Sequence, residues 1–202
     1  MPTLYEFPPT RSNRVKWALE ELGIDYTSSF VDFFKSEQQS EQHKRIHPLG
    51  LVPVYQTDTY TMYESVAILL QVLDEYPHAK LAPPIGTAER GIYYQWCVFS
   101  SAELDPHLFD FMKHTMHLSE EERVPQIAQR AEKQFRARGQ VLSDFLQDKH
   151  YVLGQHFSGA DIALGYSCNW AAYTGLLKEY PILVEYYARL QCRPSFHKVF
   201  GS

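Results

Sequence analysis

The spacing of apolar residues near the N-terminus predicts strands that alternate with helices. Residues 3–7 and 26–32 are typical of short strands. The stretch between them repeats apolar side chains at helical spacing, and Gly23 is typical of a helix end. The repeat comprises Val15, Ala18, Leu19 and Leu22. A helix of this length suits the crossover between two parallel strands.

The pattern continues with a hairpin and a second apolar helix. Residues 36–46 are polar and only weakly helical. Residues 52–57 and 60–63 then predict two strands around a short turn, and residues 65–76 predict an amphipathic helix. We therefore expect a small α/β domain over residues 1–78.

The rest of the chain is predicted to be helical. Pro77 ends the preceding helix, and a linker over residues 79–87 contains the stiff Pro83–Pro84 pair. An all-helical domain should follow over residues 88–202, with a long first helix that is interrupted at Asp105–Pro106.

One helix start in this second domain carries a specific local signal. Ser158 and Asp161 have the spacing of a capping box, and Phe157 and Ile162 can form the accompanying hydrophobic staple. A similar box at residues 119–122 predicts another helix start, with a delayed start at Pro125 as the alternative. Both are expected to stabilise structure rather than to take part in chemistry.

Composition narrows the class of function. The chain of 202 residues is 45% apolar and carries a net charge of −5, which argues against nucleic acid or an anionic membrane as a partner. No apolar run approaches the length of a membrane span, and the N-terminus does not read as a targeting segment. Cys97, Cys168 and Cys192 are widely separated and lack zinc spacing, which favours a reducing, cytoplasmic location.

The most informative stretch is residues 47–69. Pro53 interrupts an apolar run where a strand is expected, although proline cannot donate to a sheet ladder. A cis Val52–Pro53 bond resolves the conflict. It would leave the N–H and C=O of Val52 free to pair with an extended peptide.

Glu64 and Ser65 follow at the start of the apolar helix. The first turn of a helix offers unpaired N–H groups and a positive dipole end, and the serine hydroxyl adds a donor. A free backbone edge beside a pocket for a carboxylate suits a small acidic peptide.

These motifs resemble the glutathione S-transferase (GST) superfamily. The family pattern N-P-x-G-x-V-P-x-L followed by E-S-x-A-I corresponds to residues 47–55 and 64–68. The resemblance covers the whole chain and implies a cytosolic, bacterial-type GST. It further implies a thioredoxin-like α/β domain followed by an all-α helical bundle, a homodimer, and glutathione as cosubstrate for a hydrophobic electrophile. No metal is implied.

The same resemblance points to a serine/threonine-type active-site loop. The family sequence L-Y-x-x-P-x-S, with an arginine shortly after, corresponds to residues 4–10 and Arg14, so Thr10 takes the place of the catalytic serine. Its hydroxyl would stabilise the glutathione thiolate, because a free thiol with a pKa of about 8.5 is mostly protonated at neutral pH. Ser12 is a second catalytic candidate, and Tyr5 a poorer one. The alternative is that Thr10 only shapes the loop and Ser12 only caps the helix.

For glutathione, the resemblance implies contacts around the proline. Val52, before Pro53, would pair with the cysteinyl backbone, and Glu64 and Ser65 would hold the γ-glutamyl group. Leu51 replaces a lysine that many relatives place near the glycyl carboxylate. Four nearby residues could substitute for it: His43, Lys44, Arg45 and His47. The loop lacks a cysteine, which disfavours disulfide exchange through the protein's own thiol.

The electrophile site of GSTs lies beside the first long helix of the second domain. Candidate lining residues are Tyr93, Trp96, Cys97, Ser100 and Phe109, although an aromatic stripe at helical spacing is more often core. Asp110, His114 and His117 have metal-ligand spacing, but histidines late in a helix are more commonly explained by the negative dipole end.

The expected function is conjugation of glutathione to a hydrophobic electrophile. Within the same family, an isomerase, a dehalogenase or an ether-cleaving lyase is an alternative. A non-catalytic GST-fold regulatory binding protein is a further one: the loss of lysine at Leu51 favours it, and the intact Glu64–Ser65 pair argues against it.

Overall fold

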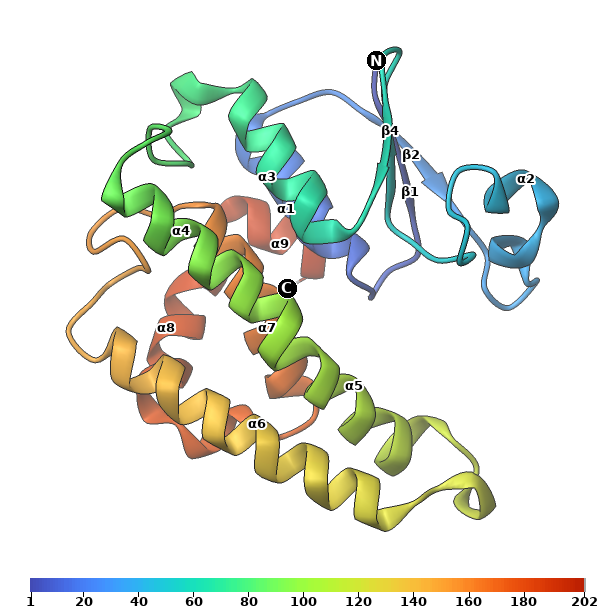
Figure 1. The fold of residues 1–202 in the computed structure, drawn as a ribbon, viewed down its shortest axis with the longest axis vertical. Coiled ribbons are helices and arrows are strands. Elements are labelled where there is room, and N and C mark those ends of the chain that lie inside the picture. The colour runs from blue at the N-terminus through green and yellow to red at the C-terminus, as the bar shows by residue number, and fades with distance from the viewer. Residues whose placement is uncertain (202) are drawn as a thin grey trace. The chain divides into compact units, whose positions relative to one another are not determined.

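The computed structural model describes residues 1–201, which fold into two compact units. One unit comprises Met1–Ala82 together with the segment that starts at Cys192, and the other comprises Pro83–Gln191 (Figure 1). The expected division assigned the C-terminal segment to the helical domain and residues 79–87 to a linker, whereas here the C-terminal segment joins the first unit and the linker residues are divided between the two units.

The first unit is built on a mixed four-stranded sheet in the order β2-β1-β3-β4. Its strands are β1 (Thr3–Glu6), β2 (Thr27–Phe30), β3 (Val54–Gln56) and β4 (Thr61–Tyr63). β1 pairs in parallel with β2, whereas β3 is antiparallel to both β1 and β4. The predicted crossover and hairpin are therefore both present.

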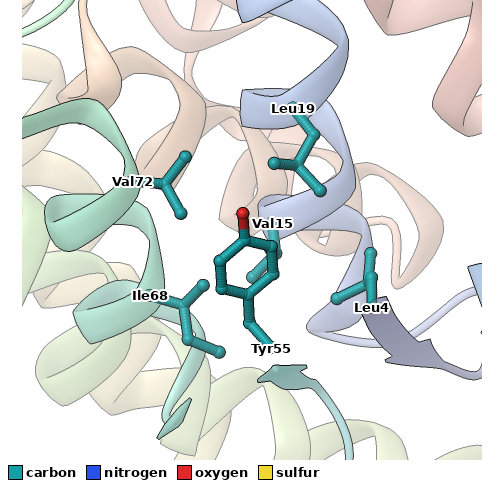
Figure 2. Packing of buried hydrophobic residues seen from close by; sticks show 6 residues of the cluster. All are labelled: Leu4, Val15, Leu19, Tyr55, Ile68 and Val72. Carbon is teal, nitrogen blue, oxygen red and sulfur yellow. The ribbon is translucent and has the colours of Figure 1, made fainter. Parts of the chain in front are cut away.

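Three helices accompany the sheet: α1 (Ser12–Leu22), the short α2 (Glu41–Lys44) and α3 (Ser65–Glu75). α1 and α3 lie together on one side of the strands and α2 on the other (Figure 1). Figure 2 shows the core between sheet and helices, where the Tyr55 ring lies among aliphatic side chains from β1, α1 and α3. These are Leu4, Val15, Leu19, Ile68 and Val72. Gly23 ends α1 in the left-handed conformation, as its position predicted.

The C-terminal helix α9 (Pro194–Phe200) belongs to this first unit and packs on α1. Trp17 is fully buried, and its ring meets Phe196 and Phe200 edge-on at centroid distances of 5.2 and 5.7 Å. The Arg193 guanidinium donates to both carboxylate oxygens of Glu21 at 2.6 Å. Aromatic burial and a bidentate ion pair thus anchor the end of the chain.

The second unit is helical. It comprises α4 (Ala88–Phe99), α5 (Asp105–Met112), α6 (Pro125–Leu146), α7 (Gly159–Tyr173) and α8 (Pro181–Gln191). α7 is buried on almost all sides, which explains its nearly uniform apolar sequence. A π-helical segment, Ser100–Leu104, connects α4 to α5, so the expected interruption falls where α5 begins. An α/β domain followed by a helical domain is confirmed.

The predicted capping box forms at the start of α7. The buried Asp161 carboxylate accepts bonds of 2.8 Å from the N–H groups of Ser158 and Val152, and 2.8 Å from the Tyr186 hydroxyl. Burial raises the pKa of Asp161 to about 6 in spite of these donors. The box at residues 119–122 also forms, but it opens only a 3₁₀ turn, and α6 begins later at Pro125.

Candidate functional site

The apolar run around Pro53 has the cis peptide bond that the sequence predicts. The Val52–Pro53 peptide bond is cis, and so is Pro8–Pro9, which the sequence reading did not anticipate. Within residues 1–201, the N–H and C=O of Val52 make no hydrogen bond, whereas Val54 already pairs with β1 and β4. A short length of unpaired backbone therefore precedes β3, as expected.

The start of α3 brings together a strained residue and a buried cation. Glu64 occupies the N-cap with φ of 73°, a backbone conformation that non-glycine residues rarely adopt. The next residue, Ser65, is buried, and its Oγ accepts a 2.7 Å hydrogen bond from Nη1 of the fully buried Arg14. The guanidinium and the helix dipole both favour an anion here.

Arg14 was recognised in the sequence only as part of a loop pattern, not as a binding residue. Its contact with Ser65 spans 51 residues of sequence, so no local signal predicts it. The clue available in the sequence was its spacing, because Arg14 lies four residues before Ala18 on the apolar side of the predicted helix, where an arginine needs an acceptor.

The loop between β1 and α1 presents two hydroxyl groups in contact. Thr10 Oγ1 and Ser12 Oγ are 2.9 Å apart, and Thr10 Oγ1 also accepts the N–H of Ser12 at 3.3 Å. Thr10 is half-buried, whereas Ser12 is fully buried. The alternative role of Ser12 as the cap of α1 does not apply, because the cap position is Arg11 and Ser12 is already the first helical residue.

Tyr5 lies within β1, and its hydroxyl is used inside the sheet. It donates to Oε1 of Gln56 on β3 at 3.1 Å. The loop hydroxyl of Thr10 is therefore the more available donor.

Two buried histidines lie beside the Leu51–Pro53 stretch. His43 Nε2 is 2.8 Å from the Leu51 carbonyl oxygen, and the His47 ring packs on Tyr63 at 4.7 Å. Burial, followed by the neighbouring His43, lowers the pKa of His47, while Glu64 opposes this shift. Leu51 is 47% exposed and carries no charge, whereas His43, which lies within α2, directly contacts its carbonyl oxygen.

Four phenylalanines gather immediately before the hydroxyl loop, a cluster that the sequence reading missed. The Phe7 ring stacks on Phe33 at 4.7 Å and contacts Phe30 and Phe34 at 5.5 and 5.7 Å. Phe34 is 91% exposed and Phe30 57% exposed, so much of the cluster faces solvent. The FxxFF spacing at residues 30–34 was a usable signal.

The electrophile-site candidates lie on the helical unit, mostly in its interior. Trp96 packs against Phe99 and Phe145 at 5.0 and 4.3 Å, and Ser100 donates to the Cys97 carbonyl at 2.7 Å. Tyr93, Cys97 and Ser100 are fully buried, and Phe109 is 42% exposed. Phe109 therefore offers the largest accessible ring of this set.

The π-helical segment Lys113–His117, which follows α5, contains His114 and His117, and one of these histidines makes a structural contact. His114 Nδ1 accepts the N–H of Val124 at 3.2 Å. No group of three potential metal ligands occurs in the described part of the chain. None of the helices in residues 1–201 combines the length and apolar content needed to cross a membrane.

Comparison with known protein families gives a match in each of the two units. The N-terminal domain of glutathione S-transferases matches residues 2–73, and their C-terminal domain matches residues 125–189. These ranges include the hydroxyl loop, the proline stretch and the start of α3 on one side, and the Asp161 capping box on the other.

Individual relatives support the same assignment. Glutathione S-transferase 1 of Schizosaccharomyces pombe is 25% identical, covering 93% of this chain and 89% of that protein. A disulfide-bond oxidoreductase of Escherichia coli, YfcG, is 26% identical over 96% of this chain and 92% of its own. The crystal structure of a glutathione transferase homologue from Sulfitobacter with bound glutathione superposes with a TM-score of 0.86 at 26% identity, covering 98% of this chain and 96% of the other. The chain belongs to the glutathione S-transferase superfamily.

Proposed function

We propose that this protein binds glutathione and transfers its thiolate to a hydrophobic electrophile. One observation carries the proposal. Within a single unit, a free backbone edge at Val52, an anion-favouring helix start at Ser65 and a half-exposed hydroxyl at Thr10 occur together. Each of them can bind one group of the tripeptide: its amide backbone, its γ-glutamyl carboxylate and its thiol, in that order.

In this proposal the glutathione cysteinyl residue pairs with the backbone of Val52, beside Leu51 and Pro53. Glu64 takes the γ-glutamyl amine, and Ser65, backed by the Arg14 guanidinium, takes its carboxylate. The glycyl carboxylate lies toward His43, which occupies the region where the lysine replaced by Leu51 would act.

Thr10 stabilises the thiolate by donating a hydrogen bond from its hydroxyl group to the sulfur. A hydrogen bond to a charged group contributes about 1.5–3 kcal/mol, which lowers a thiol pKa by about 1–2 units. No metal is needed for this step, because the anionic nucleophile is formed by proton loss alone.

The electrophile is proposed to be apolar. On the first unit, exposed rings of the phenylalanine cluster surround Phe7, which directly precedes the hydroxyl loop. On the helical unit, taken by itself, Phe109 is the accessible ring of the candidate set. The other candidates on and beside α4, Tyr93, Trp96 and Ser100, are buried inside the helical unit. A homodimer in the cytoplasm is the assembly and location proposed with this function.

Two measurements test the proposal. Retention on immobilised glutathione tests binding, and the ultraviolet absorbance of the bound thiolate, followed as a function of pH, gives the thiol pKa. The wild-type protein should lower the thiol pKa of bound glutathione and turn over a chromogenic electrophile. Thr10→Val, which keeps the shape but loses the hydroxyl, should raise that pKa by about 1–2 units, and Thr10→Ser should retain it. A bound thiol in the wild-type protein that titrates like free glutathione would refute the proposal.

Similarity to the disulfide-bond oxidoreductase favours a second candidate, glutathione-dependent disulfide reduction. The hydroxyl loop contains no cysteine, so the attacking group is the bound glutathione thiolate. It displaces one thiolate from the substrate disulfide and forms a mixed disulfide. A second glutathione thiolate then displaces the other, leaving glutathione disulfide and two substrate thiols. Reduction of hydroxyethyl disulfide measures this activity, and Cys192→Ser, which alters the exposed cysteine, should leave its rate unchanged.

A further inference from the structure

Ser12 is the most deeply buried polar group of the hydroxyl loop, and the family resemblance leaves its role open. It is fully buried on α1, yet it does not cap that helix. Its Oγ lies 2.9 Å from Thr10 Oγ1 and 3.5 Å from the N–H of Phe7. The geometry of these contacts determines where the hydroxyl protons of this pair must point.

The direction of the bond between the two hydroxyls follows from the partners of Ser12. The Phe7 N–H is a donor, so it can only fill a lone pair on Ser12 Oγ. Among the residues that the structure describes, Thr10 Oγ1 is the only acceptor within hydrogen-bond distance of Ser12 Oγ. Because a buried hydroxyl proton must have an acceptor, Ser12 donates to Thr10.

The consequence falls on Thr10. Its oxygen accepts the Ser12 hydroxyl at 2.9 Å and the Ser12 N–H at 3.3 Å, which fills both lone pairs. The hydroxyl proton of Thr10 is then not donated within the loop, and it remains available on this half-buried residue for another acceptor. The hydroxyl is held as a donor, and the bond that it receives strengthens the bond that it gives.

We propose that Ser12 is a positioning residue that donates to Thr10 and thereby holds the Thr10 proton toward the glutathione thiolate. This inference rests on the proposed function, because it requires a thiolate as the acceptor. Ser12 does not touch the sulfur. It acts through Thr10, in a relay that runs from the Phe7 side of the loop outward.

A double-mutant cycle on the thiol pKa of bound glutathione tests the relay. The four proteins are the wild type, Ser12→Ala, Thr10→Val and the double variant. We expect Ser12→Ala to raise the pKa by about 10–30% of the Thr10→Val increase, in line with the cooperative strengthening of linked hydrogen bonds. In the double variant the Ser12 substitution should add nothing, because its effect passes through Thr10. Ser12→Thr, which restores a hydroxyl, should recover the wild-type value.

The outcomes separate the relay from the proposed function. A wild-type protein that lowers the thiol pKa while Ser12→Ala leaves it unchanged overturns the relay alone. An undiminished Ser12→Ala effect in the Thr10→Val background also overturns it, since Ser12 would then act on the sulfur directly. A wild-type protein without any lowering of the thiol pKa overturns both proposals. Ser12→Gly makes the same deletion if the alanine variant does not fold.

Discussion

At the residue scale, the site depends on polar side chains that are buried and paired rather than exposed. Arg14 is fully buried, and Ser65, which accepts its hydrogen bond, is buried as well. Such a pair is costly to assemble unless both members are satisfied, and it holds the guanidinium in one place. A ligand carboxylate would therefore meet a preformed cation, with little further ordering on binding.

Ser65→Ala should weaken glutathione binding by roughly 1.5–3 kcal/mol, the contribution of a hydrogen bond to a charged group. The substitution removes the hydroxyl and the acceptor that positions Arg14. Isothermal titration calorimetry measures the change. Ser101→Ala, which alters a serine on the helical unit that donates to the Val98 carbonyl, is the control and should bind like the wild type. Equal dissociation constants for Ser65→Ala and the wild type would contradict the assignment.

His47 should make the protein less stable in mild acid. Its pKa is lowered from 6.5 in the folded protein, chiefly by burial and then by His43, so the unfolded chain binds this proton more readily. Below pH 6.5 the unfolded state therefore carries more protons, and stability falls as the pH decreases. His47→Asn should lose this part of the dependence.

Melting temperatures at pH 7.5 and 5.5 measure the effect. The decrease on acidification should be smaller for His47→Asn than for the wild type, and the difference between the two proteins isolates His47 from other groups such as His107. Parallel decreases would show that protonation of His47 does not oppose folding.

At the element scale, the two capping boxes differ in what their side chains do. Asp161 is fully buried and accepts bonds from two backbone N–H groups, the Ser158 hydroxyl and the Tyr186 hydroxyl. The box at Ser119 has the same sequence spacing but is exposed and opens a single 3₁₀ turn. Burial, rather than the motif, therefore sets how much each box stabilises.

Asp161→Ala should lower the free energy of unfolding by about 3–5 kcal/mol, because it leaves several buried donors without an acceptor. A helix cap alone would account for only about 0.5–2 kcal/mol. Urea denaturation measures the free energy of unfolding. Tyr186→Phe, which removes one of the donors, should cost about 1 kcal/mol, and Ser119→Ala less than that. A cost for Asp161→Ala no larger than that for Ser119→Ala would show that the buried network contributes little.

At the scale of the whole molecule, the segment that starts at Cys192 packs with the N-terminal unit rather than with the helical unit that precedes it. α9 follows the helical unit in sequence but packs on α1, where it covers Trp17. The same two helices are joined by an inner ion pair, Arg193–Glu21, and an outer one, Lys198–Glu20. The acid is 8% exposed in the inner pair and 22% in the outer one, and the base 28% and 65%, so the inner pair is the more buried as well as the bidentate one.

Glu21→Gln should destabilise the protein by about 1.5–3 kcal/mol, because it weakens a bidentate, partly buried contact with Arg193. Glu20→Gln, at the neighbouring position, should cost less than about 1 kcal/mol, since exposed ion pairs contribute little. Thermal unfolding followed by tryptophan fluorescence compares the two variants. Equal effects would mean that burial does not distinguish these pairs.

Local signals in the sequence were sufficient for much of this protein. The proline within the Leu51–Tyr55 run, the glycine at the end of α1 and the Ser158–Asp161 spacing each determine backbone geometry within a few residues, and the structure contains all three features. The order of strands and helices was readable for the same reason, because hydrophobic periodicity is a local property.

Other features arise only when distant segments meet. The contact of Arg14 with Ser65 joins α1 to α3, and the docking of Arg193 on Glu21 brings together residues 172 positions apart. The burial of Ser12, which makes it a donor to Thr10 instead of a helix cap, also depends on how the loop packs. The sequence by itself thus determined the elements and the family. Tertiary structure decided which polar groups are buried together, because burial and pairing depend on packing between segments that no local pattern encodes.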